Sequence, residues 1–88
     1  MEEFLRELGI EGNLNRGKND VYVLDIENSD EYGKIYSRLD RSDLLDEVVD
    51  NSQITYDAAN IQYESDDYLI SLLADFKNDS YKMTIKEI

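Results

Sequence analysis

The spacing of apolar residues changes once along the chain, from a helical period in the first half to a period of two in the second. One apolar run in the first half recurs at intervals of three and four residues: Tyr32, Ile35, Tyr36 and Leu39. Such spacing is typical of one buried face of a helix. From residue 53 onward apolar and polar residues alternate, as they do in half-buried strands. The pattern predicts helices that precede a sheet of antiparallel neighbours.

The first half contains two predicted helices separated by a loop and a strand. Residues 2–9 place Phe4, Leu5 and Leu8 on one side of a short helix, which Gly9 or Gly12 can end. Residues 12–20 have the composition of a loop, and residues 21–26 form a β-rich run. The sequence Asn28-x-x-Glu31 resembles a capping box and predicts a helix that begins near Ser29.

The helical stripe loses its phase after Leu39. A second apolar set lies on the opposite side of a continuous helix: Leu44, Leu45, Val48 and Val49. We therefore predict a break near residues 40–42 and a second short helix over residues 43–50, capped by Ser42.

The alternating half predicts strands over residues 54–58, 61–64, 68–76 and 81–85. Turns are expected at residues 58–60, 65–67 and 77–80, where small and polar residues cluster. The predicted architecture is a single α+β domain over residues 1–88, an antiparallel meander of four to five strands with two or three short helices packed on one face.

Tyrosine is frequent, with seven residues in 88. Six fall on positions predicted to face inward: Tyr32, Tyr36, Tyr56, Tyr63, Tyr68 and Tyr81. Most are expected to pack in or beside the core. Tyrosine is also enriched at binding interfaces, and Tyr56 and Tyr63 are the candidates nearest to the acidic residues.

Composition excludes several classes of function. The chain has no cysteine and no histidine, which removes thiolate chemistry and the commonest metal ligand and acid–base group. No phosphate-binding glycine motif is present, so we expect a protein that is not an enzyme and needs no cofactor. Without an apolar run long enough for a membrane span or a basic and apolar leader, we expect a soluble protein of the bacterial cytoplasm.

Charge is the most informative feature of the composition. The net charge is -12, and nine carboxylates but no basic residue lie between Arg41 and Lys77. Repulsion among like charges opposes the compact state. This block therefore suggests a surface that docks onto something positive, whereas direct binding of nucleic acid or anionic lipid is disfavoured.

The predicted helix over residues 43–50 places four carboxylates on one face: Asp43, Asp46, Glu47 and Asp50. Like charges four residues apart cost about 0.2–0.5 kcal/mol per pair. The ordinary alternative is a solvated helix face. A row of carboxylates also imitates the phosphates of a nucleic acid. We predict these partner-binding residues: Asp43, Asp46, Glu47, Asp50, Asp57, Glu64, Asp66, Asp67, Tyr56 and Tyr63.

A metal site is a weaker interpretation of the acidic residues. Calcium loops need alternating oxygen ligands and usually a glycine at the sharp turn. Glu64-Ser65-Asp66-Asp67-Tyr68 has neither. We therefore predict turn aspartates and no metal.

In size, acidity and element order the chain resembles small acidic inhibitors encoded by bacteriophages, namely the uracil-DNA glycosylase inhibitor and the anti-CRISPR proteins. The glycosylase inhibitor inserts an acidic edge segment into its target. The nearest segment here, Asp25-Ile26-Glu27-Asn28, does not match that family's motif, so no residue is carried over. The resemblance implies an inhibitor, of the anti-CRISPR type, that mimics nucleic acid and occupies the binding site of a basic nuclease or defence complex.

Two other interpretations use the same residues. One is an immunity or antitoxin-type protein that neutralises a basic toxin. The other is a small regulatory subunit without mimicry, whose contact is mainly apolar. The effect of salt separates the regulatory subunit from the nucleic-acid mimic and the antitoxin-type protein, because only charged contacts weaken steeply as ionic strength rises.

Overall fold

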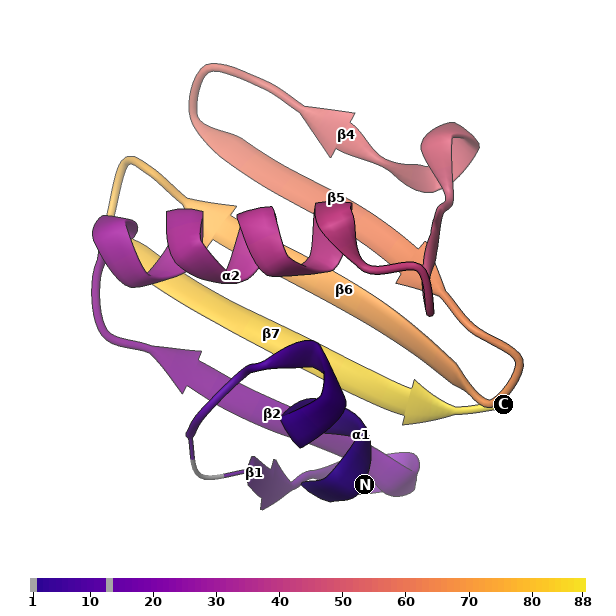
Figure 1. Ribbon diagram of the computed structural model, residues 1–88. Coiled ribbons are helices and arrows are strands. Elements are labelled where there is room, and N and C mark those ends of the chain that lie inside the picture. The colour runs from indigo at the N-terminus through magenta and orange to yellow at the C-terminus, as the bar shows by residue number, and fades with distance from the viewer. Residues whose placement is uncertain (1, 13) are drawn as a thin grey trace.

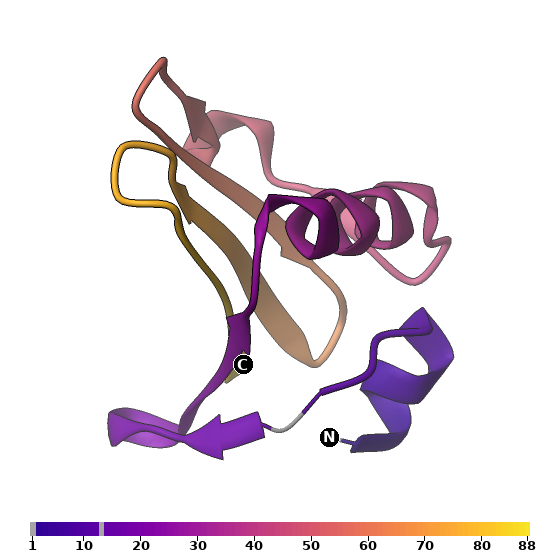
Figure 2. The ribbon, with the colours of Figure 1, turned by 90° about the vertical axis from the view of Figure 1, so that its left-hand side faces the viewer.

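A single antiparallel sheet of seven strands forms one layer of this α+β domain, and two α-helices form the other (Figure 1). The computed structural model describes residues 2–12 and 14–88. Figure 2 shows both helices on the same face of the sheet. The predicted class and the one-sided packing of helices are confirmed, but the sheet has more strands than the four to five expected.

The elements follow the chain in this order: α1 (Glu2–Leu8), β1 (Leu14–Arg16), the 3-10 helix η1 (Lys18–Asp20), β2 (Val21–Ile26), α2 (Ser29–Arg41), β3 (Asp46–Glu47), the 3-10 helix η2 (Val49–Asn51), β4 (Gln53–Ile54), β5 (Ala58–Glu64), β6 (Tyr68–Asp75) and β7 (Ser80–Glu87). The order across the sheet is β1-β2-β7-β6-β5-β3, and β4 also pairs with β5. The last three long strands therefore form the predicted meander, whereas β2 joins its far side through β7.

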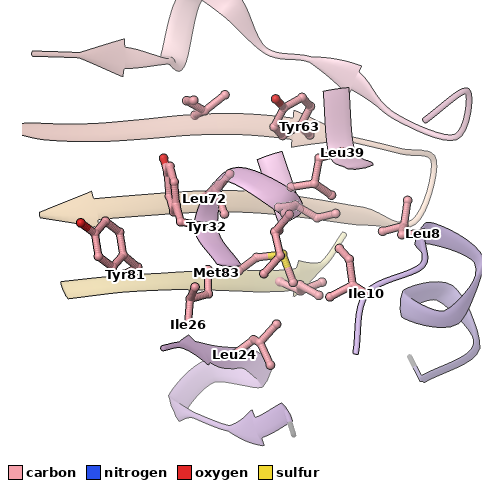
Figure 3. Packing of buried hydrophobic residues seen from close by; sticks show 14 of the residues in the cluster. Leu8, Ile10, Leu24, Ile26, Tyr32, Leu39, Tyr63, Leu72, Tyr81 and Met83 are labelled. Atoms are coloured by element: carbon pink, nitrogen blue, oxygen red, sulfur yellow. The ribbon is translucent and has the colours of Figure 1, made fainter. Parts of the chain in front are cut away.

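Helix α2 begins and packs as the sequence predicts. The side chain of Asn28 accepts a hydrogen bond from the Glu31 backbone N–H at 2.9 Å, which satisfies one free donor of the first turn. Tyr32, Ile35 and Leu39 are buried against the sheet. Figure 3 shows Tyr32 and Leu39 among the side chains that rise from the strands.

The alternation in the second half of the chain is also confirmed. One face of β6 and β7 carries the most completely buried residues of the core: Ile70, Leu72, Met83 and Ile85, all at 0% exposure. Their neighbours in sequence face away from the helices because successive strand side chains alternate between the two faces. No polar residue is buried among the described residues. The core is therefore a single apolar layer between the two helices and the sheet.

The predicted helix over residues 43–50 is wrong. Helix α2 ends at Arg41, and Ser42 closes it as the C-terminal cap instead of starting another helix. The chain then makes a turn, pairs with β5 through β3, and enters η2. Of the second apolar set only Leu45 is buried. Antiparallel pairing with β5 replaces the helical hydrogen bonds.

Strands β3 and β4 form one interrupted edge along β5. The interruption at η2 breaks the ladder, and the Ser52 hydroxyl bridges it. This hydroxyl donates to the Val48 carbonyl at 2.9 Å and accepts from the Gln62 backbone N–H at 3.0 Å. The turn predicted at residues 58–60 is also wrong, because β5 runs through it. The chain reverses at residues 55–57 instead, where the Thr55 hydroxyl and the Ala58 N–H lie 3.1 Å apart.

The six tyrosines predicted to face inward divide into two groups. Tyr32, Tyr63 and Tyr81 are buried and Tyr68 is partly buried, as predicted. Tyr36 and Tyr56 are exposed, by 39% and 98% respectively. Tyr56 lies in the short loop before β5 and not in a strand, so the period of two does not apply to it.

Within the described ranges, neither helix has the length and apolar character needed to cross a membrane.

Candidate functional site

An acidic hollow of about 450 Å³ lies at one end of the sheet. It collects residues from three separate segments: α1, the turn after α2, and the β5–β6 turn with the strand ends beside it (Figure 1). Five of the predicted partner-binding residues line it: Asp43, Asp46, Glu64, Asp66 and Asp67. We call these five and Glu7 the acidic hollow.

The β5–β6 turn places two of these carboxylates. The Ser65 hydroxyl accepts hydrogen bonds from the backbone N–H groups of Asp67 and Tyr68, at 3.4 and 3.1 Å. The Ser65 N–H donates to the Tyr68 carbonyl at 2.9 Å. Because these bonds satisfy the turn internally, the side chains of Asp66 and Asp67 are free to face solvent, and both residues are exposed.

The turn after α2 places Asp43. The Ser42 hydroxyl accepts a hydrogen bond from the Leu44 N–H at 3.2 Å, and burial of Leu45 anchors the turn to the core. Leu44 is itself 47% exposed and lines the hollow. Asp43 therefore stands at the rim beside an apolar side chain.

Asp46 and Glu64 face each other across the edge of the sheet. They are direct partners in the antiparallel pairing of β3 with β5, so their side chains lie on the same face, with Cβ atoms about 4.5–5.5 Å apart. Like charges in this arrangement are destabilising. The hollow therefore holds electrostatic repulsion, and none of the described residues that line it is basic.

The ion pairs of the described residues lie elsewhere. They are Arg16 with Asp20, and Lys34 with Glu31 at 3.3 Å. Neither pair includes a residue of the acidic hollow. The carboxylates of the hollow are thus available to cationic groups from outside.

One wall of the hollow is aromatic. The rings of Phe4 and Tyr68 lie with centroids 4.4 Å apart and an interplanar angle of 35°, and both residues line the hollow. A lysine or arginine head group gains from carboxylates through charge-assisted hydrogen bonds and from aromatic faces through cation–π attraction. The combination suits the insertion of basic side chains.

The other predicted residues do not join the hollow. Glu47 and Asp50 follow the outer edge of the sheet in β3 and η2, and Asp57 lies with Tyr56 in the loop before β5. The continuous row of carboxylates expected from a helix is therefore not formed. The acidic residues are instead divided between a concave hollow and an edge.

Tyr63, which the sequence predicts as a partner-binding residue, does not lie on the free surface of the protein. It is 1% exposed and lies in the core beneath α2 (Figure 3). Its hydroxyl has no hydrogen-bond partner among the described residues. Burial, followed by the nearby carboxylate of Asp40, raises the pKa of Tyr63 above its usual value, so its hydroxyl stays protonated at neutral pH.

Sequence reasoning missed the contribution of α1 to this site. Glu7, Phe4 and Leu44 line the hollow, but Glu7 and Phe4 are far from the acidic block in sequence. Only the packing of α1 against the end of the sheet brings them there. The amphipathic pattern of residues 2–9 showed that Phe4 turns toward the protein but could not show where.

Among the described residues, no group of carboxylates converges in a way that could hold a metal ion.

Comparisons with protein-family models, with curated proteins and with solved structures found no match to this chain.

Proposed function

We propose that this protein is a non-enzymatic inhibitor that uses its acidic surface to occupy the nucleic-acid-binding site of a basic bacterial protein, such as a Cas nuclease or a DNA-processing enzyme. The observation that carries the proposal is the acidic hollow, in which carboxylates from separate segments gather without ion pairs among the described residues. Lysine and arginine side chains that normally contact phosphates would enter it.

The concave shape refines how such an inhibitor would work. A helix would have presented a straight row of charges, whereas the hollow surrounds a few cationic side chains at once. Arginine can donate two parallel N–H···O hydrogen bonds to a carboxylate and likewise to a phosphate. The hollow therefore competes with DNA for the same donors. The net charge of -12 steers the protein toward a basic cleft and raises the association rate.

The test measures displacement of a labelled DNA duplex from purified Cas nucleases, uracil-DNA glycosylase and restriction enzymes by fluorescence anisotropy. The variant Asp43→Asn/Asp66→Asn/Asp67→Asn removes three charges from the hollow while preserving side-chain size. We expect inhibition of the responsive target to weaken at least about tenfold. Inhibition by the native protein should also weaken steeply as salt rises.

A matched control removes three exposed charges outside the hollow, by Glu3→Gln/Glu11→Gln/Glu27→Gln. This variant has the same net charge as the hollow variant, so a specific site predicts nearly native inhibition. If both variants lose activity equally, only total charge matters and the hollow is not the site. If the native protein displaces DNA from none of the targets, the proposed function is wrong for this group of enzymes.

A further inference from the structure

Most of the exposed large apolar side chains lie along one margin of the sheet. Seven such side chains are exposed among the described residues, and two of them, Leu44 and Ile88, lie elsewhere. The other five are Tyr36, Val49, Ile54, Tyr56 and Phe76, which we call the apolar edge. Val49, Ile54 and Tyr56 belong to η2, β4 and the loop that follows β4, at the β4 edge of the sheet (Figure 1). Phe76 belongs to the β6–β7 turn, and Tyr36 to α2.

Strand pairing places Ile54 on the helix-bearing face, and a backbone hydrogen bond brings Phe76 to the loop of Tyr56. Ile54 is the direct partner of Ala59, and Ala59 of Ala74, so Ile54 shares the face of two buried alanines. The Phe76 N–H donates to the Asp57 carbonyl at 2.9 Å, which joins the β6–β7 turn to the loop that carries Tyr56.

Helix α2 borders this margin with an aromatic flank. The Phe76 ring lies 6.4 Å, centroid to centroid, from that of Tyr32, and Tyr36 is one turn further along the helix. At 100° per residue, Tyr36 and Asp40 share one flank of α2. Both contribute to the raised pKa of the Tyr63 hydroxyl in β5, after burial. This flank of α2 therefore carries an exposed aromatic side chain and, one turn further along, a carboxylate.

The carboxylates beside the apolar edge indicate what covers it. Four carboxylates belong to the same elements or lie close in sequence to its members: Asp40, Glu47, Asp50 and Asp57. By contrast, Lys77 is the only basic residue directly next in sequence to any of the five members. The basic residues of α2 face the other way, since Lys34 and Arg38 border a hollow with Gly9 and Glu11. Charge complementarity thus selects an occupant with apolar side chains and positive margins.

Two buried tyrosine hydroxyl groups lie in the core near this margin. Those of Tyr32 and Tyr63 have no hydrogen-bond partner among the described residues. Unpartnered buried groups are uncommon in folded proteins, and both rings belong to the layer between α2 and the sheet (Figure 3).

We propose that the apolar edge is a second docking surface, which binds an amphipathic segment of the protein partner that carries leucine-like side chains flanked by lysine or arginine. This inference rests on the proposed function, because it assigns a second contact to the same basic partner. A patch of this kind on a small protein is typical of an interaction site. The apolar contact contributes affinity that salt does not screen, in contrast to the acidic hollow.

The test uses a synthetic peptide of alternating leucine and lysine, with a peptide of alternating serine and lysine as the charge-matched probe. Binding to the ¹⁵N-labelled protein is followed by amide chemical shifts. The leucine–lysine peptide should shift the amides of residues 54–57 and 76, and the serine–lysine peptide should bind at least about tenfold more weakly.

The variant Ile54→Thr/Tyr56→Ser should also weaken the leucine–lysine peptide at least about tenfold without changing the net charge. Ile88→Thr, which removes an exposed apolar side chain outside the apolar edge, is the control and should bind like the native protein. In the DNA-displacement assay the double variant should lose inhibition at high as well as low salt.

Several results would overturn the inference. These are shifts confined to residues 64–67, equal binding of the two peptides, no binding of either, or unchanged affinity of the double variant. Sedimentation that reveals a dimer dissolved by Ile54→Thr/Tyr56→Ser would assign the edge to a second copy of the chain instead. Each of these leaves the acidic hollow and its own DNA-displacement test untouched, so the two proposals fail separately.

Discussion

Replacement of Glu64 by lysine should stabilise this protein while it weakens the proposed binding site. Glu64 directly faces Asp46 across the β3–β5 pairing, and both residues are exposed. The substitution converts a repulsive cross-strand pair into an attractive one. The same lysine would occupy the acidic hollow from within and compete with any cationic side chain of a partner.

The expected gain follows from the geometry of the pair. Direct cross-strand charge pairs are worth roughly 0.2–1 kcal/mol, and exposure keeps them near the lower end of that range. Removing a repulsion and adding an attraction therefore gives about 0.5–1 kcal/mol. For a domain of this size that raises the melting temperature by about 2–8 °C. The gain should shrink at high salt because exposed charges are screened.

A double-mutant cycle separates this pair from the general effect of net charge. Asp46→Lys alone should also stabilise the fold, whereas Asp46→Lys/Glu64→Lys restores a like-charged pair while it lowers the net negative charge further. Thermal unfolding followed by circular dichroism at low salt measures the four proteins. The local explanation predicts that the double variant is less stable than the sum of the single gains. Additive gains would refute it, since total charge alone would then explain the effect.

Two other substitutions test local features of the fold. Ser52→Ala leaves the Val48 carbonyl and the Gln62 N–H without their bridge. Urea unfolding should therefore show that the free energy of unfolding falls by about 1–3 kcal/mol. A decrease below about 0.5 kcal/mol would contradict the bridging role. Burial raises the pKa of Tyr63. The contribution of its neutral hydroxyl to the free energy of unfolding is therefore complete below about pH 10, the ordinary pKa of a tyrosine in an unfolded chain. This contribution is lost as pH rises further. Tyr63→Phe should therefore flatten the alkaline decline in stability, whereas Tyr56→Phe, on an almost fully exposed ring, should not, and equal slopes would contradict this assignment.

The sequence was sufficient for elements whose pattern is local. Helix α2 carries its own cap in Asn28 and its own buried stripe, and the long strands β6 and β7 alternate strictly. Each signal lies within a few residues and needs no knowledge of the rest of the chain. The short strands β1, β3 and β4 have two or three residues each, too few for a period to be recognised.

The failure at residues 43–50 has a particular physical reason. Leu44, Leu45, Val48 and Val49 fit a helical stripe, and the same pattern also fits a turn followed by an edge strand. Two features of the sequence disfavour an α-helix here: β-branched valines have a low helix propensity, and a helix places like charges four residues apart. That repulsion suggests a functional surface, and it is equally a reason for the helix not to form.

The composition of the acidic hollow could be predicted only in part. The acidic block supplied five of its carboxylates, but Glu7 and Phe4 arrive from α1 through contacts between residues far apart in sequence. The same limit applies to the apolar edge. The alternating pattern predicts that Tyr56 faces inward, but Tyr56 and Ile54 are both exposed, because no helix of the described residues covers the β4 side of the sheet.

The placement of the basic residues connects the stability of the free protein to its proposed binding. Lys34, Arg38 and Arg41 border hollows on the outer side of α2, and none forms an ion pair with the acidic hollow among the described residues. If one of these three basic side chains faced the hollow, it would stabilise the fold as Glu64→Lys is expected to do. The free protein instead keeps a repulsion of roughly 0.2–0.5 kcal/mol there, which a cationic partner relieves on binding. That relief adds up to about twofold to the affinity, so variants of the hollow should show stability and affinity changing in opposite directions.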